Sequence, residues 1–174
     1  RFGAQIVPVD HYCTDKEATL QSMGLFQQHG GHGFVPRLPR DMFNELPGFI
    51  DQYFGFPTEY ASSLFVTVLS ASRFPRGADV SEPYIRIHCN NGTGLKQVAI
   101  TSTVRDNGHL CVWEEDFEFK FHINDLSAAA CLLFTINDRD KQTAGQLAFA
   151  SVPLWGLQTG YRSLQLYDML GNAV

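Results

Sequence analysis

The sequence has few positive charges, no long hydrophobic run and no segment of low complexity. Its 13 Lys and Arg residues are outnumbered by 18 Asp and Glu residues, which gives a formal net charge of -5 and a pI near 5.6. Such a chain lacks the overall basic field that attracts proteins to nucleic acid, so no nucleic-acid partner is expected. No apolar run approaches the roughly 18 residues of a membrane span, and the first residues lack a signal-peptide pattern. Any membrane contact should therefore be peripheral.

Paired cysteines are also missing. The four cysteines stand singly along the chain, as Cys13, Cys89, Cys111 and Cys131. They have neither the close pairs of a zinc site nor the density of a secreted disulfide scaffold. We therefore expect reduced thiols in a cytoplasmic protein. The six histidines do not pair with Cys or Glu at metal-ligand spacing, which favours structural or surface roles for them.

Aromatic residues, by contrast, are abundant. Phe accounts for 14 of the 174 residues, and this residue type favours strands over helices. From Ser63 onward, short runs of alternating apolar and polar residues recur at about ten-residue spacing, which predicts an antiparallel β-sandwich. We expect seven strands, at residues 63–71, 84–90, 95–102, 116–123, 130–137, 145–153 and 162–168. In the run at 116–123 the residues expected to share the core face are Phe117, Phe119, Phe121 and Ile123.

The residues before Ser63 follow a different pattern. GAQIVPVDHY reads as a buried strand, and GFVPRLP reads as an extended segment. Between them lies a predicted helix, whose apolar face would carry Leu20, Met23, Leu25 and Phe26. Strand, helix and strand make one repeat of an α/β architecture, which cannot close a core alone.

Several motifs of the second part resemble the C2 domain that follows the catalytic barrel in phosphoinositide-specific phospholipases C. They include the opening strand SSLFVTVLSASRFP, the segment SEPYIRIH and the series RDNGHLCVWEEDFEF. The most specific match is the ending VPLWGLQTGYRSLQLYD, which is similar to a Gly-Tyr-Arg signature of that group. Its matching residues are Gly160, Tyr161, Arg162 and Leu166.

The first part resembles the end of the catalytic barrel of the same family. GAQIVPVDHY and GGHGFVPRLP match two of its strands, although His29 and Arg37 replace a usual Asn and Lys. The resemblance implies three parts: residues 1–42 as the end of the barrel, 43–61 as a linker, and 62–174 as a C2 domain that lacks its last strand. The fold class implied is mainly β, a C2-type antiparallel β-sandwich with Greek-key connections, preceded by a short α/β remnant of a TIM barrel.

The family reaction implied is the hydrolysis of phosphatidylinositol bisphosphate to diacylglycerol and inositol trisphosphate. Because the catalytic residues of the family lie upstream of this sequence, the chain should not catalyse that reaction alone. We expect a membrane-targeting and scaffolding module, cytoplasmic and peripheral at membranes. Its expected partners are an anionic phospholipid surface and the upstream catalytic barrel. The alternative is a purely structural C2 domain that packs against a protein and binds neither lipid nor calcium.

The resemblance also implies a calcium site where three loops meet at one tip of the sandwich. A hard cation takes several oxygen ligands, and an Asp-x-Asp loop can supply two carboxylates. By resemblance Asp138 and Asp140 take the ligand positions, and the further candidates are Asp79 or Glu82 from the first loop and Asp106 or Asn107 from the second. Glu82 replaces a usual Asp, and Gly145 stands where another acidic residue is usual. Ordinary polar turns are the alternative reading.

Basic residues of the same loops form a candidate lipid site. Each could contribute about 1 kcal/mol to binding near an anionic membrane surface. They are Arg73, Arg76, Arg105, Arg139 and Lys141. Phe74 could insert at the interface as an apolar anchor. A solvated loop face, with Phe74 capping the sandwich core, is the alternative.

Overall fold

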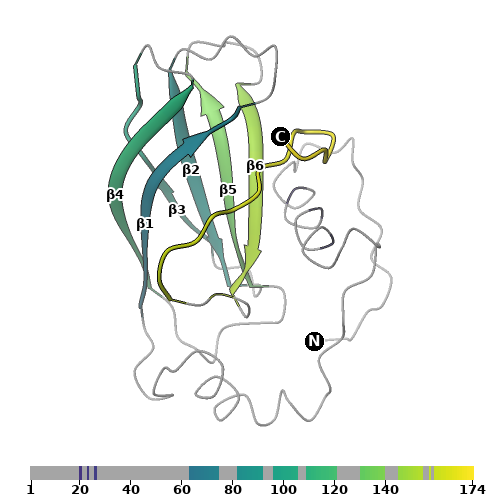
Figure 1. Cartoon of the computed structure of the whole chain (residues 1–174). Helices are drawn as coiled ribbons and strands as arrows, with labels where there is room; N and C mark the ends of the chain where they lie inside the picture. The colour runs from purple at the N-terminus through teal and green to yellow at the C-terminus, as the bar shows by residue number, and fades with distance from the viewer. Residues whose placement is uncertain are drawn as a thin grey trace.

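The computed structural model places six strands in the part of the chain that it describes, and Figure 1 shows them as two layers. The strands are β1 (Ser63–Ser72), β2 (Pro83–Asn90), β3 (Lys96–Ile100), β4 (Leu110–Lys120), β5 (Cys131–Asp138) and β6 (Gln146–Pro153). The described residues are 20, 23, 26, 63–74, 82–91, 96–105, 109–120, 130–139, 145–154, 157 and 159–174.

Every strand pair is antiparallel. β1 and β4 form a two-stranded sheet, and the other four strands form a second sheet in the order β3-β2-β5-β6. The neighbours β1 and β4, like β2 and β5, are not consecutive in sequence, so the chain crosses between the layers. The predicted antiparallel sandwich is confirmed.

The main core lies between the two sheets. It follows from the period-two alternation of the strands, because successive side chains point to opposite faces. Ile85, Ile87 and Cys89 on β2 are almost fully buried there. On β4, Phe119 is buried and Phe117 is half-buried, as predicted, while Phe121 and Ile123 lie outside the described residues. The buried residues of this first core are Val68, Ile85, Ile87, Cys89, Cys111, Trp113, Phe119, Ala130, Leu132, Ile136, Ala148 and Leu154.

A second, smaller core joins the outer face of the four-stranded sheet to residues distant in sequence. Its fully buried members are Leu20, Leu133 on β5 and Phe149 on β6. The half-buried members are Met23, Tyr167 and Met169. The backbone is helical at Leu20, Met23 and Phe26, as predicted, and Leu25 lies outside the described residues.

Side chains tie the two sheets together between β3 and β4. Gln97 on β3 donates from Nε2 to the carbonyl of Lys120 on β4 (2.5 Å), and its Oε1 accepts from the backbone N–H of the same lysine (3.0 Å). The Gln97 amide therefore links β3 to β4, which belong to different sheets. Further along, the Glu115 carboxylate accepts hydrogen bonds from the N–H and hydroxyl of Ser102, while the Trp113 indole N–H donates to the Ser102 carbonyl (2.9 Å).

β4 is longer than the predicted strand at 116–123, because it begins at Leu110. A bulge interrupts its pairing with β1 between Val68 and Ser70, and Glu114 beside it has a φ of 54°. Cys111 and Trp113 are buried and alternate with exposed residues, but the acidic Glu114 and Glu115 that follow interrupt this apolar pattern in the sequence.

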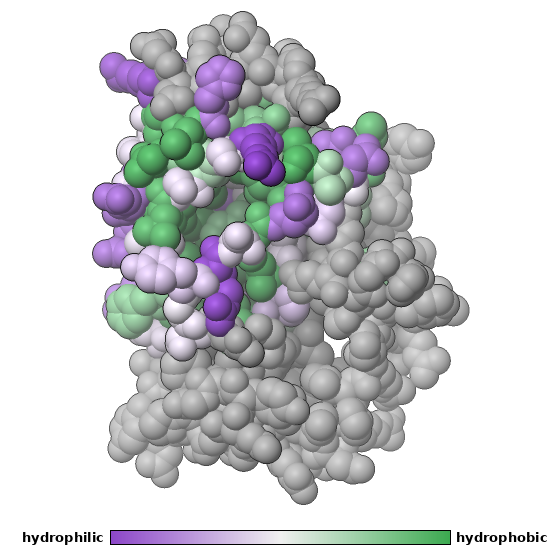
Figure 2. Space-filling model, viewed as in Figure 1, coloured by the Kyte–Doolittle hydropathy of each residue, from purple (hydrophilic) through white to green (hydrophobic). Residues whose placement is uncertain are grey.

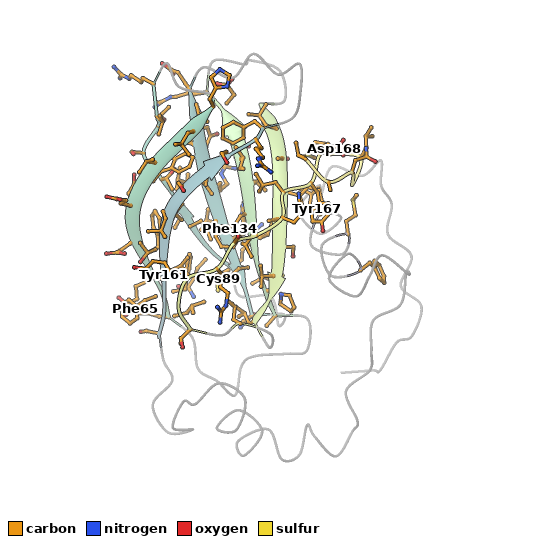
Figure 3. All side chains as sticks on the ribbon, viewed as in Figure 1. Phe65, Cys89, Phe134, Tyr161, Tyr167 and Asp168 are labelled. Carbon is orange, nitrogen blue, oxygen red and sulfur yellow. The ribbon has the colours of Figure 1, made fainter. Side chains whose placement is uncertain are left out.

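The strand predicted at residues 162–168 is wrong. Only Tyr167 makes bridges, to Phe149 on β6 and to Ala173. The chain turns back on itself here instead of extending a sheet, since Asp168 accepts hydrogen bonds from the N–H groups of Leu170 (2.9 Å) and Asn172 (2.8 Å). Figure 3 shows Tyr167 and Asp168 beside β6, in this C-terminal hairpin.

The predicted barrel end, residues 1–42, lies outside the described residues except for residues 20, 23 and 26, and the predicted linker, 43–61, lies outside them entirely. In the part of the chain that is described, no helix has the length and apolar character needed to cross a membrane.

Candidate functional site

The residues that flank three of the interstrand segments meet at one end of the sandwich, at the top of Figure 1. Ser72 at the end of β1 pairs with Leu110 at the start of β4. Pro83 at the start of β2 pairs with Asp138 at the end of β5. We call this the loop end, and define it by its described residues: Arg73, Phe74, Glu82, Val104, Arg105, His109, Asp138, Arg139 and Gly145.

Backbone hydrogen bonds hold these flanking residues side by side. The N–H of Arg139 donates to the Glu82 carbonyl (3.1 Å), and the N–H of Val104 donates to the Pro83 carbonyl (3.0 Å). The N–H of Asp138 donates to the Gly145 carbonyl at 2.6 Å. Segments from three distant parts of the sequence are therefore fixed relative to one another before any ligand is considered.

The two described acidic candidates are in direct contact. Oδ1 of Asp138 accepts a hydrogen bond from the backbone N–H of Glu82 at 3.1 Å. The Asp138 side chain is only 3% exposed, whereas Glu82 is half-buried. Asp138 therefore links the start of β2 to the end of β5, in addition to any role toward a cation. Sequence reasoning did not find this link, because it depends on the β2–β5 register.

Three exposed arginines belong to the loop end together with the acidic pair. Arg73 follows β1, Arg105 follows the segment after β3, and Arg139 follows β5. Arg73 has a φ of 60°, a left-handed conformation that ends the strand abruptly. Phe74 is half-buried and packs against the first core, which is the contact that a capping residue would make.

Not every predicted site residue can be placed. Glu82, Asp138, Arg73, Phe74, Arg105 and Arg139 belong to the loop end, whereas Asp79, Asp106, Asp140, Arg76 and Lys141 lie outside the described residues. Within the described ranges, no group of three or more His, Cys, Asp or Glu residues could hold a metal ion. The chemistry of calcium needs six to eight oxygens, so the acidic pair fits such a site only as part of a larger set.

The buried titratable groups belong to the strands instead. Burial, together with the neighbouring Cys131, raises the pKa of the Cys89 thiol to about 11. Burial likewise raises the pKa of Cys131 to about 11. Burial, together with the charge of Arg86, lowers the pKa of His88. These groups are therefore neutral near pH 7 and add no charge to the sandwich.

Apolar surface near the loop end was missed as well. Leu69, Leu110 and Val112 are exposed on the outer face of the β1–β4 sheet, and Figure 2 shows hydrophobic surface on this side of the molecule. The signal was present in the sequence, because Leu110 and Val112 alternate with buried residues that were not assigned to a strand.

Comparison with known proteins identifies the sandwich. The family model described as "C2 domain" matches residues 62–169. A solved structure of a C2 domain of the RIM protein from Drosophila is 17% identical, covers 61% of this chain and 85% of that chain, and superposes with a TM-score of 0.46.

Relatives match almost the whole chain. The "1-phosphatidylinositol 4,5-bisphosphate phosphodiesterase" of Dictyostelium discoideum is 27% identical over 99% of this chain and 22% of its own length. "Inactive phospholipase C-like protein 2" of Homo sapiens is 28% identical over 100% of this chain and 16% of its own length. The chain thus spans about a fifth of these relatives, and the predicted resemblance to phosphoinositide-specific phospholipases C is confirmed. Because the family model covers more than half of the sequence, the chain belongs to the C2 domain family.

Proposed function

We propose that this chain is the membrane-targeting and scaffolding C2 portion of a phosphoinositide phospholipase C-like protein, and that it does not hydrolyse lipid itself. The observation that carries the proposal is the loop end, where strand register and backbone hydrogen bonds bring three exposed arginines to the same end of the sandwich as Glu82 and Asp138. Whether the parent protein is an active phosphodiesterase is a separate matter, since relatives of both kinds match equally well. Membrane targeting is useful to either kind.

The arginines supply the proposed attraction to anionic lipid. Arg73, Arg105 and Arg139 lie at strand ends and are exposed, so their guanidinium groups can reach phosphates in a headgroup layer. At about 1 kcal/mol per residue they would supply about 3 kcal/mol, which is weak and reversible binding. Arg76 and Lys141 are proposed to add to it, and Phe74 to contribute an apolar contact.

Calcium is proposed to bind at the acidic pair. Asp138 and Glu82 would provide carboxylate oxygens, and the remaining ligands would come from Asp79, Asp106 and Asp140. A bound cation would neutralise these carboxylates and leave the neighbouring arginines as the dominant charge at this end. Lipid binding would then strengthen with calcium.

The scaffolding role is supported by the second core. There Leu20, from the segment that resembles the barrel end, is 2% exposed against Phe149 on β6. A buried contact of this kind would fix the sandwich relative to the part of the protein that precedes it. The same contact supports the alternative function, a purely structural C2 domain that needs neither lipid nor calcium.

Vesicle co-sedimentation separates these functions. The chain is mixed with phosphatidylcholine vesicles, with or without about one third phosphatidylserine, in calcium or in chelator. The proposal predicts binding to the anionic vesicles only, stronger with calcium, and calcium-independent in the variant Asp138→Asn. Arg73→Gln should weaken this binding, and Arg162→Gln is its matched control. Arg162 is also exposed, but it lies outside the loop end and its guanidinium donates to the carbonyls of Tyr161 and Thr159. Absence of binding under all conditions would favour the structural alternative.

A further inference from the structure

The outer face of the β1–β4 sheet is graded from apolar to acidic along its length. On β4 the outward residues begin with Leu110 and Val112, both 53% exposed, continue with Glu114, Asp116 and Glu118, and end with Lys120. On β1, Leu69 is exposed beside the bulge. We define the outer patch as Leu69, Leu110 and Val112. It lies against the loop end, whereas the acidic residues lie toward the opposite end.

The outer patch is continuous with the arginines of the loop end. Leu110 pairs with Ser72, the residue before Arg73, and Val112 pairs with Ser70. The strand rise of about 3.3 Å per residue puts Val112 only about 7 Å further from the loop end than Leu110. Apolar side chains of a peripheral protein enter the boundary between headgroups and acyl chains to about 5–10 Å. Leu110 and Val112 can therefore enter this boundary while the arginines of the loop end contact the lipid phosphates.

The acidic residues of the same face restrict how much of the β1–β4 sheet can contact an anionic membrane. Glu118 is about 26 Å along β4 from Leu110, well beyond the screening length of about 8 Å at physiological salt. Glu118 is paired with Lys120, whose Nζ lies 3.7 Å from its carboxylate. A domain lying flat on an anionic membrane would therefore press chiefly Glu114 and Asp116 against like charges. A tilted domain, with the loop end and the outer patch down, keeps them in water.

From this distribution we infer that the β1–β4 sheet, and not the four-stranded sheet, is the side of the domain that leans on an anionic lipid bilayer, with Leu69, Leu110 and Val112 entering its interface. The inference rests on the proposed function and adds the orientation to it. The opposite side provides an internal comparison. Val98 and Ile100 on β3 are 51% and 50% exposed, nearly the same as Val112 and Leu110, but they belong to the other sheet.

Exposure alone would predict a different contact. Phe65 is 74% exposed, more than any residue of the outer patch. It pairs with Glu118 and lies about 23 Å along β1 from Ser72. Figure 3 shows it near the end of β1 that is remote from the loop end. If surface hydrophobicity alone decided the contact, Phe65 would take part in it, as would the still more exposed Tyr161 and Leu170, whereas the tilted orientation leaves Phe65 in water.

The test places an environment-sensitive nitrobenzoxadiazole label at one introduced cysteine of the full 174-residue chain, in which Cys13 is replaced by serine and the remaining Cys89, Cys111 and Cys131 are buried. The variants are Val112→Cys, Val98→Cys and Phe65→Cys, and the vesicles contain phosphatidylcholine with about one third phosphatidylserine. We expect a blue shift and a several-fold rise in emission at position 112 only. A label at 112 that stays in water while the chain is bound, or an equal response at 98 or 65, overturns the inference.

Affinity gives a second measurement that does not depend on labelling. The variant Val112→Thr, which preserves shape, should weaken binding to the same vesicles about fivefold, and Val98→Thr should change it less than about twofold. Equal effects of the two substitutions overturn the inference. The inference is also overturned if the chain forms a dimer that Val112→Thr dissociates, because the outer patch would then bind a second copy of the chain. If the unaltered chain binds no vesicles, the proposed function itself is wrong. If the chain binds vesicles while the label at position 112 stays in water, only the inferred orientation is wrong.

Discussion

Replacing Asp138 by alanine should destabilise the protein more than replacing it by asparagine. The Asp138 side chain is 3% exposed, and its Oδ1 accepts a hydrogen bond of 3.1 Å from the backbone N–H of Glu82. Alanine removes this acceptor from a part-buried N–H, which costs about 1–3 kcal/mol. Asparagine keeps an oxygen within the same reach and removes only the charge. We therefore expect the asparagine variant to lose less than about 1 kcal/mol.

Urea unfolding followed by tryptophan fluorescence measures both losses, because Trp113 is buried in the first core. Asp116→Ala is the matched control, since that carboxylate also accepts a hydrogen bond, from the Thr67 hydroxyl, but is exposed. A change within about 0.5 kcal/mol is expected for it. The reasoning is refuted if the alanine and asparagine variants of Asp138 lose equal stability, because the neutral oxygen would then not be replacing the carboxylate.

Three further predictions concern residues away from the loop end. Phe149→Ala should lower the free energy of unfolding by about 3–5 kcal/mol in urea, because this side chain is fully buried in the second core; a loss below about 1 kcal/mol would contradict that packing. The thiols of Cys89 and Cys131, each with a pKa of about 11, should not react with a disulfide reagent at pH 8 until urea unfolds the chain, and rapid labelling of the folded chain at either residue would contradict their burial. Hydrogen bonds, chiefly from Asn172, lower the pKa of Asp168 below its ordinary value of 3.8. The Asp168 carboxylate therefore contributes fully to stability above pH 3.8, and this contribution is lost as the pH falls through the pKa of the folded state. The variant Asp168→Asn should remove this part of the acid dependence when the free energy of unfolding is measured against pH.

Most strands could be predicted because their alternation is local. Pro83–Asn90, Cys131–Asp138 and Gln146–Pro153 lie within one or two residues of the predicted runs. The first half of β4 could not, since Glu114 and Glu115 break the apolar pattern and only the bulge shows how they are accommodated. The last predicted strand failed for a related reason. Residues 162–168 alternate like a strand, but only Tyr167 among them pairs with β6, and after Asp168 the chain turns back so that Ala173 pairs with Tyr167.

The candidate site was predictable in composition but not in geometry. The acidic and basic residues of the loop end could be named from the resemblance, because they stand in the turns between predicted strands. The burial of Asp138 could not, since it follows from pairing with Pro83, a residue distant in sequence. The outer patch could not be predicted from the sequence either, because cross-strand pairing decides which side of β4 faces water.

In the proposed function, the exposed arginines of the loop end hold the domain on anionic lipid. The most direct measurement is the partition coefficient of the triple variant Arg73→Gln, Arg105→Gln, Arg139→Gln onto vesicles with about one third phosphatidylserine, compared with the unaltered chain. At about 1 kcal/mol per arginine, we expect the partition coefficient to fall about a hundredfold, with unchanged stability in urea. An unchanged partition coefficient would contradict the proposed function.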